Sequence, residues 1–460
     1  MGNTESGSYQ KRLSRILPDE QTVLERGFDS LFQTPSEPKK SVGLQTFQDT
    51  LGNLLPGNMC QRVFTGIKGV SLNSKISTPC VEISKEQYVV FLVDLLRGTA
   101  EEKSSIVYQM ISVNNSEHVN GHQVQKFLED LIGSMVDVLK EHRLLNGWNL
   151  EKMHDCSLGA YGLALHLLSQ LQSIDGQKFE RPELLNFSCS QSTIEDWLYK
   201  VPMISLFLRI LLTLALSILK DHTEHQKDIH SLLPKCIGMK NSSFVSLLDL
   251  PTVMFLNSHL PSDVQHKWRL LFSTKVHGES FSQLCGHLVD QGPCLLILKD
   301  SNGFVFGGYA SHTWEVKPQF QGDNRCFLFT ISPNLDVYTY TGYNDHYMYL
   351  NHGQQTMPNG LGMGGQHDYF GLWIDSNFGK GHSKAKPRCT TYNSPQLSAK
   401  EEFSIDTLEV WAIGELPEHL LAKSKKSILD SDPEARALLE MTGRTRQSDG
   451  LRQVAEDDEN

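Results

Sequence analysis

Four histidines stand in one segment of the chain, and histidine is the side chain that most often binds metals or transfers protons. They are His346, His352, His367 and His382. A zinc site needs its ligands at set short spacings, commonly with cysteine among them. These histidines have no such spacing, so we predict no metal site and expect ordinary hydrogen bonding instead. A metal-dependent or redox-protective enzyme that uses this histidine-rich segment stays the alternative function.

Three further groups in the same half of the chain each lack a part that catalysis needs. The glycine-rich run 359–366 has no lysine to reach a phosphate and fits neither phosphate-binding motif. Cys285 and His287 are two residues apart on a predicted helix, so their side chains do not face each other. The aspartates of this region follow strands or flank glycines, where turn hydrogen bonds satisfy them. They are Asp300, Asp323, Asp345 and Asp375. We predict no catalytic residue and no cofactor.

Short strands must position these residues. Branched and aromatic side chains alternate along 326–332, 337–342 and 369–375, which predicts three β-strands. The connection 343–368 is predicted to be a long loop, and loops of that length are usually functional or disordered; its aromatic residues argue against disorder. Its amphipathic side chains are candidates for protein contact, with closure of one end of the fold as the alternative. They are Tyr343, Asp345, His346, Tyr347 and Tyr349.

The rest of this half predicts an α+β fold. Asn302 and Gly303 separate the apolar runs 294–299 and 305–310, which predicts a hairpin with a type I′ turn. Many short strands joined by glycine-rich turns favour two packed sheets. Helices are expected at 251–257, 266–272 and 280–288.

Several separated motifs occur in order through this region. They are LPSDVQHKWRLLFSTKVHGESFSQL at 260–284, GPCLLILKDSNGFVFGGYAS at 292–311, Trp314, the segment 326–382 described above, and LEVWAIG at 408–414. Together they resemble the TLDc domain over roughly 244–414. The resemblance implies a β-sandwich flanked by helices, binding to the vacuolar H⁺-ATPase, and no enzyme of defined mechanism.

The whole chain resembles the lysosome-associated member of that family that acts in mTOR signalling. The resemblance implies mTOR complex components as partners. It also implies a location on the cytoplasmic face of the lysosomal membrane and in the cytoplasm. None of these expectations follows from composition or spacing.

The preceding part, 17–240, is predicted to be an all-helical domain of helix–loop–helix pairs that looks like degenerate EF-hands. A calcium loop needs an array of oxygen ligands with carboxylates at fixed positions. The best-placed loop, 114–124, offers Asn114, Ser116 and Gly121 but not the carboxylates. We therefore predict packing modules that bind no calcium.

Two segments of the helical part stand out by hydropathy. The run 201–219 approaches the length of a membrane span, but Arg209 near its middle would be costly in lipid. We predict a buried helix there, with a membrane contact as the alternative. The polar segment 222–241 is predicted to be a solvated linker.

The N-terminal 16 residues read MGNTESGSYQKRLSRI and contain no apolar signal segment. Gly2 followed by Ser6 matches the N-myristoylation pattern, so Gly2 is the predicted lipid acceptor. One myristoyl chain binds membranes only marginally and needs a second signal. Lys11, Arg12 and Arg15 are candidates for contact with an anionic leaflet.

The tail, 415–460, contains one predicted helix at about 433–442. Asp432 is a favourable N-cap, Pro433 suits the first helical position, and Gly443 ends the helix. A helix this short is marginal alone in water, so its apolar face needs a surface on this chain or on a partner. The predicted contact residues on that face are Ala435, Leu438 and Leu439.

Bulk composition limits the function classes. The 460 residues carry a formal net charge of −11, which argues against nucleic-acid binding because phosphate contacts need clustered lysine and arginine. Nine cysteines without a CxxC pair fit a reducing compartment. The prediction is a non-enzymatic adaptor with three parts: a lipidated N-terminus, a helical domain and a TLDc domain with a helical tail.

Overall fold

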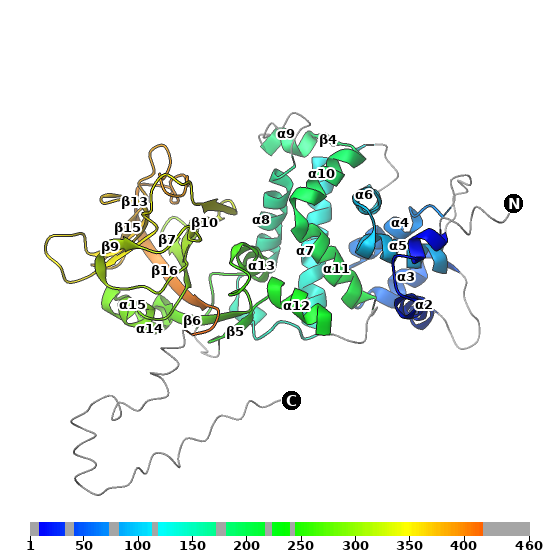
Figure 1. Cartoon of the computed structure of the whole chain (residues 1–460), viewed down its shortest axis with the longest axis horizontal. Coiled ribbons are helices and arrows are strands. Elements are labelled where there is room, and N and C mark those ends of the chain that lie inside the picture. The colour runs from blue at the N-terminus through cyan, green and yellow to red at the C-terminus, as the bar shows by residue number, and fades with distance from the viewer. Residues whose placement is uncertain are drawn as a thin grey trace, which may run out of the picture.

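The computed structural model describes residues 9–32, 41–72, 82–112, 118–171, 181–216, 223–239 and 244–416. The helices of the first half lie side by side at one end of the molecule, and the strands of the second half lie at the other (Figure 1). The overall class is α+β, as predicted.

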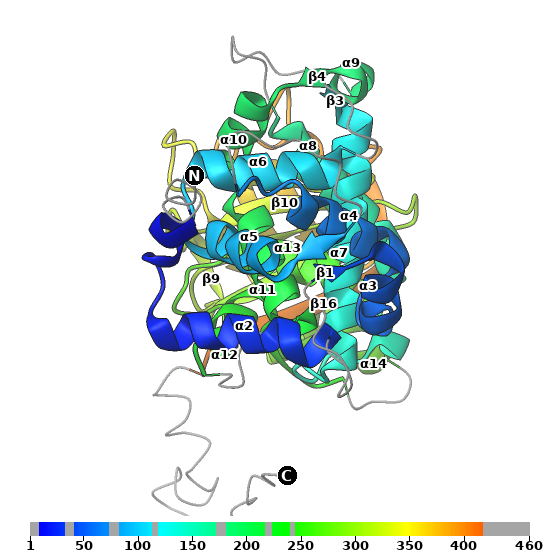
Figure 2. The ribbon, with the colours of Figure 1, turned by 90° about the vertical axis from the view of Figure 1, so that its right-hand side faces the viewer.

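Amphipathic sequences build the helical half. Its elements are α2 (Pro18–Phe32), α3 (Leu44–Leu51), α4 (Gly57–Lys68), α5 (Lys85–Arg97), α6 (Ala100–Ile111), α7 (Gly121–Glu141), η1 (Leu150–Lys152), α8 (Cys156–Ser169), α9 (Arg181–Asn186), α10 (Gln191–Lys200) and α11 (Pro202–Ala215). Viewed from its end, this half places α5 and α6 in front of α7 (Figure 2). Ser84, Thr99 and Asn120 begin α5, α6 and α7 with reciprocal capping boxes, which satisfy backbone N–H groups at each helix start.

Short strands join the loops between successive helices. β1 (Ser41–Val42) pairs with β2 (Ile83–Ser84), and β3 (Val119–Asn120) pairs with β4 (Ser188–Cys189), both antiparallel. Each strand directly precedes or follows a helix, so the pairs tie one helix–loop–helix unit to another. The loop predicted to fail as a calcium site lies partly outside the described residues.

The most apolar run forms α11, and its inward residues are buried, including Phe207 and Leu211. Arg209 lies on its half-exposed side and pairs with Asp228 at 2.9 Å. Among the described residues no single helix is long and apolar enough to span a bilayer; α10 and α11, bent by 92° at their junction, pass only as a pair. Burial within the helical half accounts for the apolar composition of α11.

The prediction of a solvated linker at 222–241 is wrong. The structure has α12 (Thr223–Leu232) and β5 (Lys235–Ile237) there, and β5 pairs in parallel with β6 (Lys267–Ser273). Leu232 and Leu233 are buried. Ile229, Cys236 and Met239 are buried as well, so apolar residues fix the segment against the core, although its mean composition is that of a linker.

Antiparallel strands form most of the second half. Its remaining elements are α13 (Leu250–His259), α14 (Thr274–His277), α15 (Phe281–Leu288), β7 (Cys294–Asp300), β8 (Val305–Ala310), β9 (Lys317–Gln321), β10 (Phe327–Ser332), β11 (Asp336–Thr339), β12 (Met348–Asn351), β13 (Gly360–Gln366), β14 (Tyr369–Asp375), β15 (Lys380–His382) and β16 (Glu402–Ile413). Strand order is β11-β10-β8-β7-β16-β15-β14-β13-β12-β9, and β6 pairs with the end of β16.

The long strand β16 belongs to both parts of this sheet. Its start pairs with β15 and its remainder pairs with β7. The two parts pack against each other through a shared apolar core. Leu296 and Leu328 come from one part, and Met363 and Leu372 come from the other. This arrangement places the β13–β14 hairpin and its neighbouring loops at the far end of the molecule from the helices (Figure 1).

Three strands lie where the sequence predicts a helix or a loop. The segment predicted to be a helix at 266–272 is β6, and the predicted loop 343–368 contains β12 and β13. The sequence pattern does not predict β13 because its glycines interrupt the alternation of apolar and polar residues that is typical of a strand. Gly362 is needed for packing, since a Cβ there would lie 2.6 Å from the Phe370 ring. The predicted hairpin at Asn302–Gly303 is present, but only Gly303 has positive φ, so the turn is not type I′.

The helical and strand-rich halves share one core rather than meeting at a linker. Trp148 of the helical half lies 5.3 Å from Trp411 on β16 and 5.8 Å from Trp268 on β6, measured between ring centroids. The Trp148 Nε1–H donates to the Pro234 carbonyl at 2.9 Å. All three indoles are buried. These contacts hold the strand-rich half in a fixed orientation on the helices.

Candidate protein-interaction surface

The connection between β11 and β12 is held rigidly although it contains no regular structure. The Thr341 N–H donates to the Thr391 carbonyl at 2.9 Å, and the Thr341 hydroxyl donates to the Thr390 carbonyl at 2.7 Å. The Thr391 hydroxyl donates to Asn344 Oδ1 at 2.7 Å and accepts from the Gly365 N–H at 2.9 Å. The loop is therefore fastened to the segment before Tyr392 and to strand β13.

His346 connects this loop to the β13–β14 hairpin. Its Nδ1–H donates to the Gly365 carbonyl at 2.5 Å, and the Gly364 N–H donates to the His346 carbonyl at 3.1 Å. Its ring stacks on Phe320 with centroids 4.1 Å apart. With Nδ1–H donating to the backbone and one ring face covered by Phe320, His346 positions the loop.

Beneath the loop lies an aromatic cluster. Tyr349, Phe370 and Trp373 are buried, and Phe320 packs against them. The Tyr349 hydroxyl donates to the Pro358 carbonyl at 2.9 Å. Tyr349 thus closes this end of the fold, which was the alternative role considered for the loop tyrosines. The cluster gives the surface above it a rigid base.

Two tyrosines project from this base into solvent. Tyr343 is 79% exposed, and Tyr369, which opens β14, is 59% exposed. Asp345 is also exposed. We call Tyr343, Asp345 and Tyr369 the tyrosine surface. Amphipathic aromatic residues held in one conformation lose little entropy on contact, which suits a protein interface.

The predicted contact residues divide between this surface and the interior. Tyr343 and Asp345 lie on the surface, and His346 supports it. Tyr347 is 9% exposed and packs against Tyr340, so it offers no ring to a partner. Gly2, Ala435, Leu438 and Leu439 lie outside the described residues. Sequence reasoning missed Tyr369 because it was assigned to strand 369–375, where its place in the turn was not considered.

The residues considered for enzyme chemistry are used in packing. Within the described ranges no group of three or more histidine, cysteine or carboxylate side chains is arranged to hold a metal. His352 packs against Phe281, and His382 packs against Trp373. Burial raises the pKa of the Cys285 thiol to about 11, which leaves it protonated at neutral pH and disfavours a nucleophilic role.

Two of the three basic residues near the N-terminus are already paired within the chain. Arg12 lies 3.2 Å from Asp94, and Arg15 lies 2.5 Å from Glu102. The Arg15 guanidinium lowers the pKa of Glu102 to about 2. These ion pairs fix the 9–13 helical turn on α5 and α6, so Arg12 and Arg15 are less available to an anionic leaflet than the sequence predicts.

Comparisons with known proteins agree on the strand-rich half. The family model described as the TLDc domain matches residues 241–414. The chain is 36% identical over 168 residues to nuclear receptor coactivator 7 of Gallus gallus, an alignment covering 36% of this chain and 18% of that protein. Similarity to that protein is therefore confined to about one domain.

Other relatives match from end to end. The chain is 73% identical over 459 residues to the protein named MTOR-associated protein MEAK7 of Xenopus laevis, with 100% of both chains covered. It is 48% identical over 461 residues to the Homo sapiens protein of the same name, again with 100% of both covered. This similarity includes the helical half and the tail as well as the TLDc region.

Proposed function

Because this chain belongs to the family of MTOR-associated MEAK7 proteins and carries their TLDc domain, we propose that it is a non-enzymatic adaptor at the lysosomal membrane. The name of its relatives supports association with mTOR complex components as part of that role. In this proposal the TLDc half binds a protein partner and the N-terminus holds the chain at the membrane. The proposed partner of the TLDc half is the vacuolar H⁺-ATPase.

The tyrosine surface is the observation that supports a binding role best. Tyr343 and Asp345 stand on a loop fixed by Thr390 and Thr391, and Tyr369 stands on the adjoining hairpin. Exposed tyrosines on a rigid support are typical of interface hot spots, where few residues supply most of the binding energy.

Membrane attachment rests on the predicted lipid on Gly2. A single myristoyl chain needs a second contact for stable binding. With Arg12 and Arg15 paired to carboxylates, we propose that the bound partner supplies this second contact rather than a basic patch. Attachment would then depend jointly on Gly2 and on the tyrosine surface.

Replacing both Tyr343 and Tyr369 with alanine is expected to weaken binding of the purified vacuolar H⁺-ATPase catalytic sector about 10–100-fold. Both side chains are largely exposed, so the free energy of unfolding should change by less than about 1 kcal/mol. Binding is measured by surface immobilisation of the full chain and titration with the sector. Thermal melting of the same preparation checks folding.

The matched control is Tyr199→Ala, because Tyr199 is 86% exposed but lies on α10 of the helical half. It should bind as the natural chain does. Equal binding by the double variant and the control would remove the tyrosine surface from the proposed interface. Stoichiometric metal in the purified chain would instead favour the alternative, an enzyme using the histidine-rich segment.

A further inference from the structure

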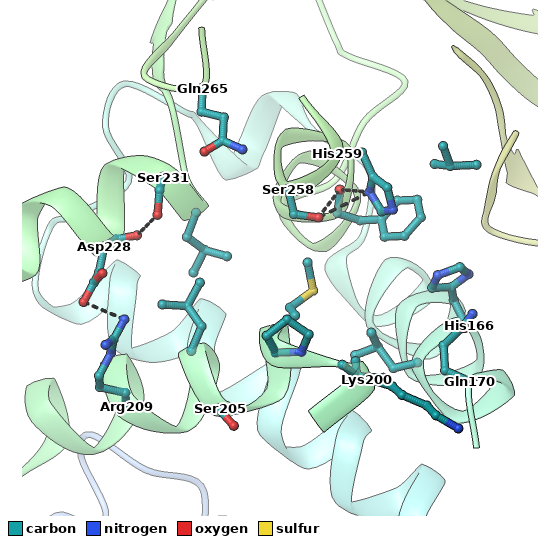
Figure 3. A pocket seen from close by; sticks show the side chains of 18 of the residues that line it. His166, Gln170, Lys200, Ser205, Arg209, Asp228, Ser231, Ser258, His259 and Gln265 are labelled. Atoms are coloured by element: carbon teal, nitrogen blue, oxygen red, sulfur yellow. Dashed lines mark hydrogen bonds and ion pairs between the residues drawn. The ribbon is translucent and has the colours of Figure 1, made fainter. Parts of the chain in front are cut away.

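A groove runs along the boundary between the helical half and the strand-rich half. It encloses about 860 Å³, a volume within the range of pockets that take specific ligands. Residues of α11 form one side, and residues of α12 and α13 form the other (Figure 3). β11 contributes Val337, and α5 contributes Leu96. The groove shares no residue with the tyrosine surface, although Thr339 of β11, which lines the groove, precedes Tyr343 by four residues.

Part of the groove wall is apolar and only partly covered. Met203, Leu206, Leu96 and Val337 line it, and each is half-buried. Figure 3 shows Arg209 and Asp228 together at one side and Lys200 at the opposite side, beside His166. Apolar residues flanked by charged side chains are a combination that can receive an amphipathic helix.

The sequence predicts such a helix in the tail, and the tail begins close to the groove. The described chain ends at Leu416. Just before it, Glu415 pairs with Lys267 at 2.8 Å and with His266 at 3.5 Å. The residue before His266 is Gln265, which lines the groove. The tail therefore leaves the folded part at the edge of the groove.

Length and charge of the tail fit this site. From Leu416 to Ala435 the chain can extend about 60 Å, far more than the span of the groove. The predicted helix 433–442 is about 15 Å long. The part of α11 that lines the groove, Pro202 to Arg209, is about 12 Å long, so the two lengths are similar. Three acidic residues precede or open that helix. The groove carries two lysines, besides Asp336 and the Arg209–Asp228 ion pair. The acidic residues are Asp430, Asp432 and Glu434, and the lysines are Lys103 and Lys200.

We propose that the tail helix docks in this groove of its own chain, with Ala435, Leu438 and Leu439 against Met203 and Leu206. The docked helix cannot contact a partner, so the groove holds the adaptor in a resting state and partner binding releases the tail. The regulatory consequence rests on the proposed function, in which the free tail helix binds the partner. The docking itself is independent of that function.

Cysteine trapping tests the docking directly, because a disulfide forms quickly only between side chains that meet. Of the eight cysteines within the described ranges, seven are buried and Cys156 is half-buried, so the background reaction is small. The test variant carries Met203→Cys with Leu438→Cys. The matched control carries Leu158→Cys with Leu438→Cys, since Leu158 is 70% exposed and lines a second cavity of about 630 Å³ beside α8.

In dilute full-length chain under mild oxidation, the test pair should form an intrachain disulfide at least about tenfold faster than the control pair. Equal rates in the two variants would overturn the proposal. A disulfide that forms only between chains would also overturn it and assign the groove to a second copy. Peptide mapping after digestion distinguishes the two products.

A charge exchange gives a second measurement that does not depend on cysteine reactivity alone. Lys103→Glu with Lys200→Glu should slow trapping of the test pair about tenfold. Adding Asp430→Lys with Asp432→Lys should restore the rate. Slowing without restoration would show that the lysines act on the fold of the groove and not on the tail, and would contradict the proposed orientation of the helix.

The trapping experiment contains no partner, so its outcome is separate from that of the proposed function. Trapping without any binding to the vacuolar H⁺-ATPase would leave the docking intact and remove its regulatory meaning. If the tail docks in the groove and the chain also binds the vacuolar H⁺-ATPase, Met203→Asp should release the tail and strengthen partner binding several-fold. Weaker or unchanged partner binding by Met203→Asp, in a chain that melts normally, would overturn the resting state.

Discussion

Replacing Trp148 with alanine is expected to lower the free energy of unfolding by about 3–5 kcal/mol, the usual cost of deleting a buried indole. Trp148 is 3% exposed and contacts Trp268 and Trp411 of the strand-rich half, so its removal opens a cavity where the halves join. It also leaves the Pro234 carbonyl without its donor. Urea denaturation followed by intrinsic fluorescence and by circular dichroism measures the change.

The same variant tests whether the two halves unfold together. In the natural chain the fluorescence and dichroism transitions should coincide, because one core runs through both halves. In Trp148→Ala they should separate as the coupling weakens. Tyr199→Ala, at an exposed position of the helical half, should shift neither transition. Coincident transitions with a loss below about 1 kcal/mol in Trp148→Ala would contradict a shared core.

Replacing Glu409 with alanine is the second change expected to have a large effect, again about 3–5 kcal/mol. Glu409 is fully buried on the central strand β16. Its carboxylate accepts from the Ser246 hydroxyl at 2.9 Å, the Leu247 N–H at 2.6 Å and the Trp411 indole at 3.1 Å. Alanine would leave these donors buried without an acceptor and free the segment that leads into α13.

Glu409 also predicts a pH dependence with a definite sign. Burial raises the pKa of its carboxyl to about 7 in the folded chain, against 4.5 as its ordinary value. The folded state therefore binds the proton more tightly than the unfolded state does. The resulting stabilisation is fully present below pH 4.5 and is lost as the pH rises through 7.

Comparison with Glu409→Gln isolates this contribution, because glutamine keeps the shape and does not titrate. The unfolding free energy of the natural chain relative to Glu409→Gln should fall by about 2–3 kcal/mol between pH 5 and pH 8. Denaturant titrations at the two pH values give the difference. Parallel pH profiles for the two proteins would show that Glu409 does not titrate in this range.

How far the sequence predicts this fold depends on which residues form each element. β10, β11 and β14 are rich in branched and aromatic residues. β10 and β14 lie where alternation predicts them, whereas β11 ends at Thr339, three residues before the predicted end at 342. β13 was missed because it contains four glycines. Gly360 and Gly362 are required by packing against Phe370 and Trp373, and Gly364 by packing against Tyr392, which the local sequence pattern does not reveal. The segment that forms β6 has helix-like apolar spacing, but pairing with β16 decides its conformation.

The candidate site was predictable only in part. Tyr343 and Asp345 could be found because amphipathic residues gathered in a long connection. The burial of Tyr347 and the contribution of Tyr369 depend on the hydrogen bonds that fasten the loop to Thr391 and Gly365, which join segments distant in sequence. Arg12 and Arg15 likewise pair with residues distant in sequence, Asp94 and Glu102, so these ion pairs could not be predicted from the sequence.

Binding of the purified vacuolar H⁺-ATPase catalytic sector by the full chain, compared with a chain lacking 417–460, tests the central claim most directly. We predict that the full chain binds and that the shortened chain binds about tenfold more weakly, because the TLDc half supplies the main contact and the tail helix adds to it. Absence of binding by both chains, with normal melting of each, would contradict the adaptor function.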